Sequence, residues 1–411
     1  MEERVAVTGI GIVSPCGLKK ETMWANLKKG KSFVDEITRF DASLYGSHIA
    51  GQVHDLDYYT HLPGRLIKKI DLFSHMALVA SKQAIEDSKL DLEKIDKTRV
   101  GVFMGNALGG WLFAETELRD MYLEGREGIS PYMASAWFAA APQGQITIFY
   151  GFKGYSKTVV ADKASSGLAI WYGAKVVKAG KNDYVLAGGM EAPITPYALL
   201  CANTSGTLSK NNASPKKAYK PYDLNRDGFV LAEGAGVVML EKESQAKQRQ
   251  ALAYAFIKGI GFSSDGYHHM RYSNDYGMLS YAIEEAIKDA GWNKEDVDYI
   301  CLDAEATVMG DYLEVQALKK VFGSSFNNIA MSAPKSMFGS MLGAQSVMDL
   351  IITIFSMKNN LVLPTINYEV RDPYCEFNCT PNKAMEREIN KALIVSRGRG
   401  GINVVLAVEK E

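Results

Sequence analysis

The sequence predicts an α/β protein whose central sheet is covered by helices on both faces. Strand-like segments such as 184–187 and 404–408 are continuous apolar runs, which are typical of strands buried on both faces. These runs alternate with helical periods, of which 279–290 is the clearest. Apolar residues make up 47% of the 411 positions and charged residues 23%, as in ordinary globular proteins. Together these observations favour layers of helices around buried strands.

Nine segments are predicted to be strands because they are short, apolar and rich in β-branched residues. In chain order they are 5–13, 100–104, 158–161, 184–187, 236–240, 254–260, 299–302, 392–395 and 404–408. The helix predicted over 279–290 places Leu279, Ala282, Ile283 and Ala286 on one face, and Gly291 follows as a stop signal.

The strand predicted at 5–13 contains the triplet Gly9-Ile10-Gly11, which invites comparison with dinucleotide-binding loops. That fingerprint requires a third glycine, but Ser14 and then Pro15 stand there. We therefore interpret the glycines as a tight strand-to-loop turn. The strand predicted at 254–260 runs into the same triplet, 259–261, which hints at an internal duplication.

A polar segment at 242–252 divides the chain into two predicted halves, 1–250 and 251–411. It is charged and has no large apolar residue before Leu252, as expected of a surface link.

The overall composition excludes several classes of function. Forty-six basic and 47 acidic residues leave a net charge of −1, without the basic excess of a general nucleic-acid binder. The start of the chain lacks the pattern of a secretory signal, and no apolar run has the roughly 20 residues that span a bilayer. Five scattered cysteines fit a reducing compartment, so we expect a cytoplasmic protein with no membrane partner.

Metal ligands and catalytic histidines are scarce. Cys375 and Cys379 lack the second Cys/His pair of a zinc site, so we expect no metal. Any imidazole-based mechanism must use one of the six histidines, at positions 48, 54, 61, 75, 268 and 269.

Motifs spread over the whole chain together resemble one family. The longest is PYDLNRDGFVLAEGAG, at 221–236. The others, in chain order, are VAVTGIGIVSPCG (5–17), GVFMGNALGG (101–110), GGMEAPITP (188–196), GTLS (206–209), KSMFG (335–339) and GGIN (400–403). In this order the sequence is similar to the β-ketoacyl-acyl-carrier-protein synthases. The resemblance implies a thiolase-like fold of five layers, α-β-α-β-α, made of two similar halves and assembled as a dimer.

Members of that family carry out decarboxylative Claisen condensation with a cysteine nucleophile and two histidines. By spacing, the cysteine position falls on Lys163, or on Ala164 if the match slips by one residue. The histidine positions fall on Glu305 and Ser340. Two phenylalanines near the end are replaced as well, by Arg397 and by Arg399 at the gating position. The resemblance therefore implies a protein that has lost the condensing chemistry.

The substituted positions suggest what fills the former site. We expect Lys163 and Glu305 to form a buried ion pair that keeps the lysine protonated and non-nucleophilic. The alternative is that Lys163 bonds only to backbone and water. Lys335 and Glu233 match residues that support the site in the family, and we expect them to persist as architecture.

One branch of the family lacks the nucleophile in this way: the chain length factors, or ketosynthase β-subunits, of type II polyketide synthases. The segment 109–118 resembles the interface helix of that branch. The resemblance maps tunnel-lining positions onto Trp111, Ala114 and Leu118, which share one helical face at i, i+3 and i+7. The same stripe is also compatible with an ordinary dimer core.

The resemblance further implies two partners: an active ketosynthase α-subunit in a heterodimer, and an acyl carrier protein. This chain would bind no cofactor itself, because the carrier protein brings the phosphopantetheine. Two other interpretations stay open. The chain could be an active synthase or malonyl decarboxylase with an atypical site, or a homodimeric pseudoenzyme that holds the carrier protein.

Overall fold

The computed structural model describes residues 3–411, and its ten-stranded main sheet consists of two five-stranded halves. The strands of the first half are β1 (Val5–Val13), β4 (Val100–Gly105), β5 (Lys157–Val159), β6 (Tyr184–Glu191) and β8 (Gly234–Lys242). Those of the second half are β9 (Ala255–Ser264), β10 (Tyr299–Cys301), β11 (Ala330–Ser332), β14 (Lys391–Gly398) and β15 (Ile402–Lys410).

The two halves have the same topology. The first runs β5-β4-β6-β8-β1 and the second β11-β10-β14-β15-β9. In each half, three strands are parallel and the last two pairings are antiparallel. Antiparallel pairing of β1 with β9 joins the halves.

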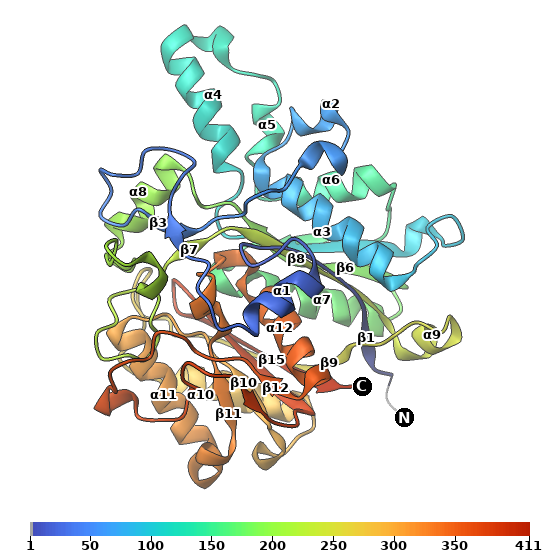
Figure 1. Cartoon of the computed structure of the whole chain (residues 1–411). Coiled ribbons are helices and arrows are strands. Elements are labelled where there is room, and N and C mark those ends of the chain that lie inside the picture. The colour runs from blue at the N-terminus through green and yellow to red at the C-terminus, as the bar shows by residue number, and fades with distance from the viewer. Residues whose placement is uncertain (1–2) are drawn as a thin grey trace.

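Helices lie outside and between the sheet halves. The outer layers contain α3 (Leu72–Ser88) with α6 (Ala141–Tyr150), and α10 (Gly277–Asp289) with α11 (Val308–Phe322). The middle layer contains α7 (Ser165–Lys178) and α12 (Gln345–Asn359) (Figure 1). This arrangement confirms the predicted five-layer, thiolase-like fold.

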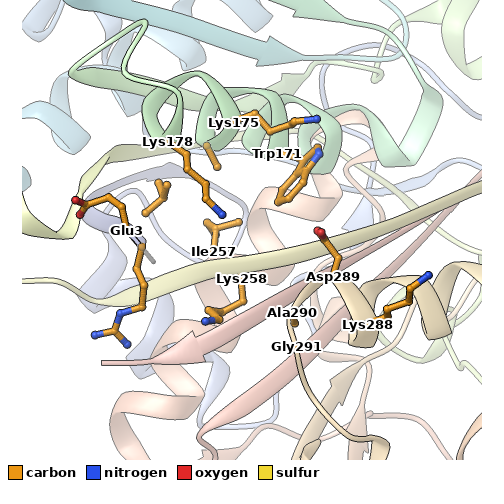
Figure 2. A pocket seen from close by; sticks show the side chains of 13 residues that line it. Glu3, Trp171, Lys175, Lys178, Ile257, Lys258, Lys288, Asp289, Ala290 and Gly291 are labelled. Carbon is orange, nitrogen blue, oxygen red and sulfur yellow. The ribbon is translucent and has the colours of Figure 1, made fainter. Parts of the chain in front are cut away.

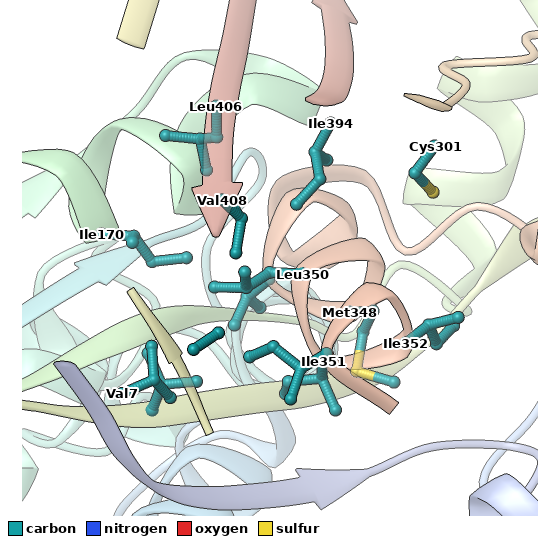
Figure 3. Packing of buried hydrophobic residues seen from close by; sticks show 14 of the residues in the cluster. Val7, Ile170, Cys301, Met348, Leu350, Ile351, Ile352, Ile394, Leu406 and Val408 are labelled. Atoms are coloured by element: carbon teal, nitrogen blue, oxygen red, sulfur yellow. The ribbon is translucent and has the colours of Figure 1, made fainter. Parts of the chain in front are cut away.

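The middle layer forms the largest part of the core. Met348, Leu350 and Ile351 of α12 lie in one apolar cluster with Val7 of β1 and Leu406 of β15. Figure 3 shows these side chains of α12 between strands of the two sheet halves. All residues of α12 from Gln345 to Met357 are buried, the polar ones included, as expected of a helix that packs on all sides.

The repeated Gly-Ile-Gly triplet has a different role from the predicted one. Gly9 and Gly11 lie inside β1, so the expected strand-to-loop turn is wrong. A Cβ on Gly11 would lie 1.8 Å from the carbonyl oxygen of Ala80 in α3, and one on Gly261 would lie 1.7 Å from that of Ala282 in α10. The glycines therefore allow a helix to pack directly on the strand backbone in both halves.

In both halves, an aspartate at the end of the outer helix accepts a hydrogen bond from the backbone of the first strand. Asp87 at the end of α3 accepts a hydrogen bond of 2.9 Å from the backbone N–H of Ile10. Asp289 at the end of α10 accepts one of 2.9 Å from that of Ile260.

Smaller elements surround this framework. The segment 242–252, expected as a link, contains α9 (Glu243–Gln248). The remaining strands are β2 (Asp35–Glu36), β3 (Ile49–Gly51), β7 (Leu231–Ala232), β12 (Leu361–Val362) and β13 (Met385–Glu386). The remaining helices are α1 (Lys20–Leu27), α2 (Gly64–Ile67), α4 (Trp111–Glu124), α5 (Met133–Ala136) and α8 (Pro196–Thr204).

The connection from β4 to β5 projects from the first half. It carries α4 and α5, which extend beyond the layers in Figure 1. Its exposed large apolar side chains are Leu108, Leu118, Met121, Tyr122, Leu123, Tyr132, Trp137, Phe138, Ile148, Phe149 and Tyr155. Within residues 3–411, no helix combines the length and apolar content needed for a bilayer span.

Candidate functional site: a charge cluster in place of a nucleophile

Lys163 lies at the turn that begins α7. Asp162 before it has a positive φ of 48°, and the short helix Asp162–Ala164 leads directly into α7. The Lys163 side chain is 6% exposed. Ala164 packs in the apolar core, so Lys163 is the residue of this turn that enters the polar cluster.

The Lys163 ammonium lies close to two carboxylates. Its Nζ lies 2.9 Å from Oδ2 of Asp303 and 3.7 Å from Oε1 of Glu305. Burial by itself lowers the pKa of Lys163, but the negative charges, first of all that of Asp303, outweigh burial and raise this pKa well above the usual lysine value. The structure thus brings Lys163 and Glu305 together, and Asp303 is the closer partner.

Both carboxylates are held by further hydrogen bonds. Glu305 accepts from the hydroxyls of Tyr272 at 3.1 Å and Thr307 at 2.9 Å. Asp303 Oδ1 accepts from the backbone N–H of Arg397 at 3.1 Å. Burial opposes ionisation of Asp303, but nearby positive charges, led by Lys163, keep its pKa below the usual value. The charged forms of Lys163 and Asp303 are therefore both favoured, and the side chains around them are nearly fully hydrogen-bonded, which is the condition under which buried charges persist.

Lys335 and Arg397 extend the cluster. Lys335 Nζ lies 2.7 Å from Asp349 Oδ2 and donates to the carbonyl oxygen of Asp303 at 3.1 Å. The Arg397 guanidinium donates to the carbonyl oxygen of Gly310 at 2.8 Å and lies 4.0 Å from the centre of the Tyr272 ring. Arg397 is 2% exposed, so it fills buried space at its position.

Ser340 and Glu233 lie apart from the ammonium. The backbone of Ser340 bonds to Val230 and Ala232 at 2.7 Å each, whereas its buried hydroxyl has no partner within residues 3–411. Both oxygens of Glu233 accept from the Arg39 guanidinium at 2.6 Å. Glu233 is therefore a structural anchor in this chain.

The cluster contains no cysteine and no histidine. Lys163, Asp303, Glu305, Lys335 and Arg397 offer no thiolate and no imidazole. A protonated lysine has no free electron pair with which to attack a thioester. The neighbouring thiol of Cys301 is buried in the core, and burial raises its pKa well above the usual value.

The positions matched to a tunnel lie beside a groove of about 690 Å³ between α4 and α8. Trp111 and Leu118 line it, and Trp111 packs against Tyr197 of α8 with 4.8 Å between ring centroids. Ala114 is 1% exposed and is not among the lining residues. The groove is also lined by Arg39, Phe40, Leu112, Glu115, Thr116, Arg119 and Pro196.

A smaller cavity of about 250 Å³ shares Trp111 and Tyr197 with the groove, since these residues line both spaces. Arg399 borders this cavity, and its guanidinium donates to the hydroxyls of Ser205 at 3.3 Å and Thr207 at 3.4 Å. Trp111 and Tyr197 thus border both the groove and the space beside Arg399.

A third cavity, of about 210 Å³, borders the second half of α7 and includes Lys178, Lys258 and Lys288 (Figure 2). Its cations already have acidic neighbours: Lys258 lies 3.6 Å from Glu409, and Lys288 lies 3.1 Å from Glu285. We assign no ligand to it.

The sequence did not reveal Asp303 and Tyr272 as parts of the site. Asp303 stands two residues before Glu305, so an acidic pair in one loop was the available signal. Nothing in the sequence near Tyr272 indicates that it reaches Glu305, because the two residues are 33 positions apart.

Comparisons with known proteins define the family. The model of the beta-ketoacyl synthase N-terminal domain matches residues 2–246, and that of the C-terminal domain matches residues 254–369. With its five-layer fold, the chain belongs to the beta-ketoacyl synthase family.

Curated relatives carry the name 3-oxoacyl-[acyl-carrier-protein] synthase 2. The protein from Coxiella burnetii is 36% identical over 409 residues, covering 100% of this chain and 99% of the relative. That from Staphylococcus aureus strain COL is 34% identical, covering 99% of this chain and 98% of the relative.

Similar solved structures include proteins of polyketide synthesis. The ishigamide ketosynthase/chain length factor superposes with a TM-score of 0.92 at 26% identity. A ketosynthase solved with its type II acyl-carrier protein and a hexaketide gives 0.92 at 28%, and a beta-ketoacyl synthase from Burkholderia phymatum gives 0.93 at 27%. Each alignment covers 100% of both chains.

Proposed function

We propose that this chain is a non-catalytic subunit, a chain length factor, which pairs with an active ketosynthase in a type II polyketide synthase. The observation that carries the proposal is the Lys163 ammonium, buried at the former nucleophile turn between Asp303 and Glu305 at 2.9 and 3.7 Å. Such a pair stabilises the cation and makes the amine unreactive.

Exposed apolar side chains on the first half support the proposal that the chain pairs with a partner of the same fold. Tyr122 is 89% exposed, Leu123 71% and Ile148 76%, although large apolar side chains rarely gather on a free surface. Obligate interfaces are large, commonly above about 2,000 Å², and rich in apolar residues. We therefore infer that 101–165 pairs with the ketosynthase α-subunit.

The division of labour follows from the charge cluster and the groove. The partner would hold the growing chain on its own cysteine, and the phosphopantetheine of an acyl carrier protein would deliver malonyl units. This chain would close the tunnel with the Trp111–Tyr197 wall, limit the chain length and exclude water from reactive intermediates.

The test is the Trp111→Ala variant in the reconstituted heterodimer. Removing the indole opens the groove toward the cavity beside Arg399, so the main product should gain at least one extension unit. Product lengths are measured by mass spectrometry, with Tyr374→Ala, an exposed aromatic residue outside 101–165, as the matched control. Unchanged product length with intact assembly would contradict the proposal.

A catalytic alternative is favoured by one observation: the curated relatives at 34–36% identity are named as synthases. An active synthase would release carbon dioxide from malonyl carrier protein in the absence of a partner. A pseudoenzyme that only holds carrier protein would instead form a stable homodimer when expressed alone.

A further inference from the structure

One buried carboxylate caps two helices. Asp71 is the N-cap residue of α3, and its Oδ1 accepts from the backbone N–H of Phe73 at 2.9 Å. Its Oδ2 accepts at 2.6 Å from the N–H of Phe113, the third residue of α4. The N-cap residue of α4 itself is Gly110, which has no side chain to offer. Asp71 therefore supplies the anionic cap that the start of a helix favours.

The approach of α4 to Asp71 requires the glycine. A Cβ on Gly110 would lie 2.8 Å from Cβ of Asp71 and 2.5 Å from the carbonyl oxygen of Ala136. A Cβ does not approach a non-bonded heavy atom this closely in folded proteins. Any larger residue at 110 would therefore push the start of α4 away from Asp71.

A second carboxylate ties α4 to the start of α8. Oε1 of Glu115 accepts from the hydroxyl of Thr195 and, at 3.2 Å, from the backbone N–H of Tyr197. Thr195 is the N-cap residue of α8. The helix is thus fixed between the beginnings of α3 and α8 by two acidic side chains.

Apolar packing contributes little to the position of α4. Ala114 is its single buried residue, whereas Leu118 and Met121 are exposed. Trp111 packs on Tyr197, but both rings also border open space. The first turn is therefore held mainly by polar contacts: those of Asp71 and Glu115, and the bond of 2.9 Å from the Gly110 N–H to the carbonyl oxygen of Trp137.

We propose that Asp71 is a positioning residue for product length: by capping α4 it fixes Trp111, two residues before Phe113, as the wall of the tunnel. This inference rests on the proposed function, since it concerns the same wall. The carboxylate touches neither the growing chain nor the groove, and it acts through the helix.

Ionisation of Asp71 at neutral pH agrees with this role. Burial raises the pKa of its carboxyl to about 6, against the lowering effect of the two N–H donors and of Arg39, while Glu115 adds to the rise. At pH 7 the group is still mostly ionised and accepts both hydrogen bonds.

The test uses Asp71→Asn in the reconstituted heterodimer. An amide has one acceptor oxygen, so it can keep the local bond to Phe73 but presents an N–H₂ toward Phe113. Amide hydrogen exchange in the first turn of α4 should speed up about fivefold, as expected from the loss of one cap. The share of products longer than the wild-type main product should rise by a similar factor, about fivefold.

Two further variants separate the possible outcomes. Asp57→Asn, an exposed aspartate that caps one short helix through Tyr59, should leave both readouts unchanged. Gly110→Ala keeps the carboxylate but displaces α4, so it should shift product length as Asp71→Asn does, and it replaces that variant if Asp71→Asn fails to fold.

Unchanged exchange in α4 would overturn the positioning role, whatever the products are. Faster exchange with unchanged product length, in a heterodimer where Trp111→Ala does change length, would overturn the link to length control. If Trp111→Ala also leaves product length unchanged, the proposed function fails, and the exchange result alone decides whether Asp71 positions α4.

Discussion

The two halves of the molecule share a framework but differ in the connection between their second and third strands. Both have the same strand order, the same glycine pair beneath an outer helix, and the same aspartate bond to the first strand. In the second half this connection is α11, which buries nine of its 15 residues. In the first half it contains α4, which buries Ala114 alone.

The difference indicates which parts of the chain can change in sequence without loss of the fold. The first strand and the outer helix of each half are fixed by close backbone contacts at Gly11 and Gly261 and by the hydrogen bonds that Asp87 and Asp289 accept. Beyond its first turn, α4 in the first half contains no glycine and no buried residue. It can therefore serve a partner, whereas α11 completes the core of its own half.

The largest effect on stability is expected at the residues that precede the two middle helices, α7 and α12. Lys163 precedes α7 and is charged, whereas Ser340 lies shortly before α12 and has no hydroxyl partner within residues 3–411. Lys163→Met should lower the free energy of unfolding by about 3–5 kcal/mol, because it leaves buried carboxylates without their cation. Chemical denaturation of the isolated chain or of the heterodimer measures this.

Ser340→Ala is the matched control and should stay within about 0.5 kcal/mol of wild type, since no bond is lost. Adding Asp303→Asn to Lys163→Met should recover part of the loss. A loss below about 1 kcal/mol for Lys163→Met would contradict the assignment of a buried, energetically coupled ion pair.

A smaller effect is expected from the glycines that both halves share. Gly11→Ala and Gly261→Ala each force a Cβ within 2 Å of a helix carbonyl oxygen, and each should cost about 1–3 kcal/mol. Thermal or chemical unfolding measures the cost. In Gly144→Ala, on α6, the new Cβ meets no atom within 4 Å, and this control should stabilise the chain by about 0.5–1 kcal/mol. Clearly unequal losses in the free energy of unfolding for Gly11→Ala and Gly261→Ala would contradict the structural equivalence of the two halves.

The sequence predicted most of the framework because buried strands and helices leave local signals. Nine of the ten main-sheet strands lie at predicted segments, whereas β11 (Ala330–Ser332) has the sequence Ala-Met-Ser and contains no β-branched or aromatic residue to mark it as a strand. The spacing to the family motifs predicted Lys163 and Glu305 as site positions, because the turns that carry such residues stay at constant distances from the motifs within a family. The pairing of Lys163 with Glu305 was expected from the sequence, but the other partners of these residues could not be predicted. Tyr272 and Arg397 meet Glu305 and Asp303 through folding alone, across separations of 33 and 94 residues.

Intact-mass analysis of both subunits during turnover tests the central claim most directly. The heterodimer is incubated with acyl and malonyl carrier protein, and each chain is weighed. We expect an acyl adduct on the ketosynthase only, this chain at its unmodified mass, and no turnover by this chain in the absence of the partner. A covalently loaded acyl group on this chain, together with turnover in the absence of the partner, would contradict it.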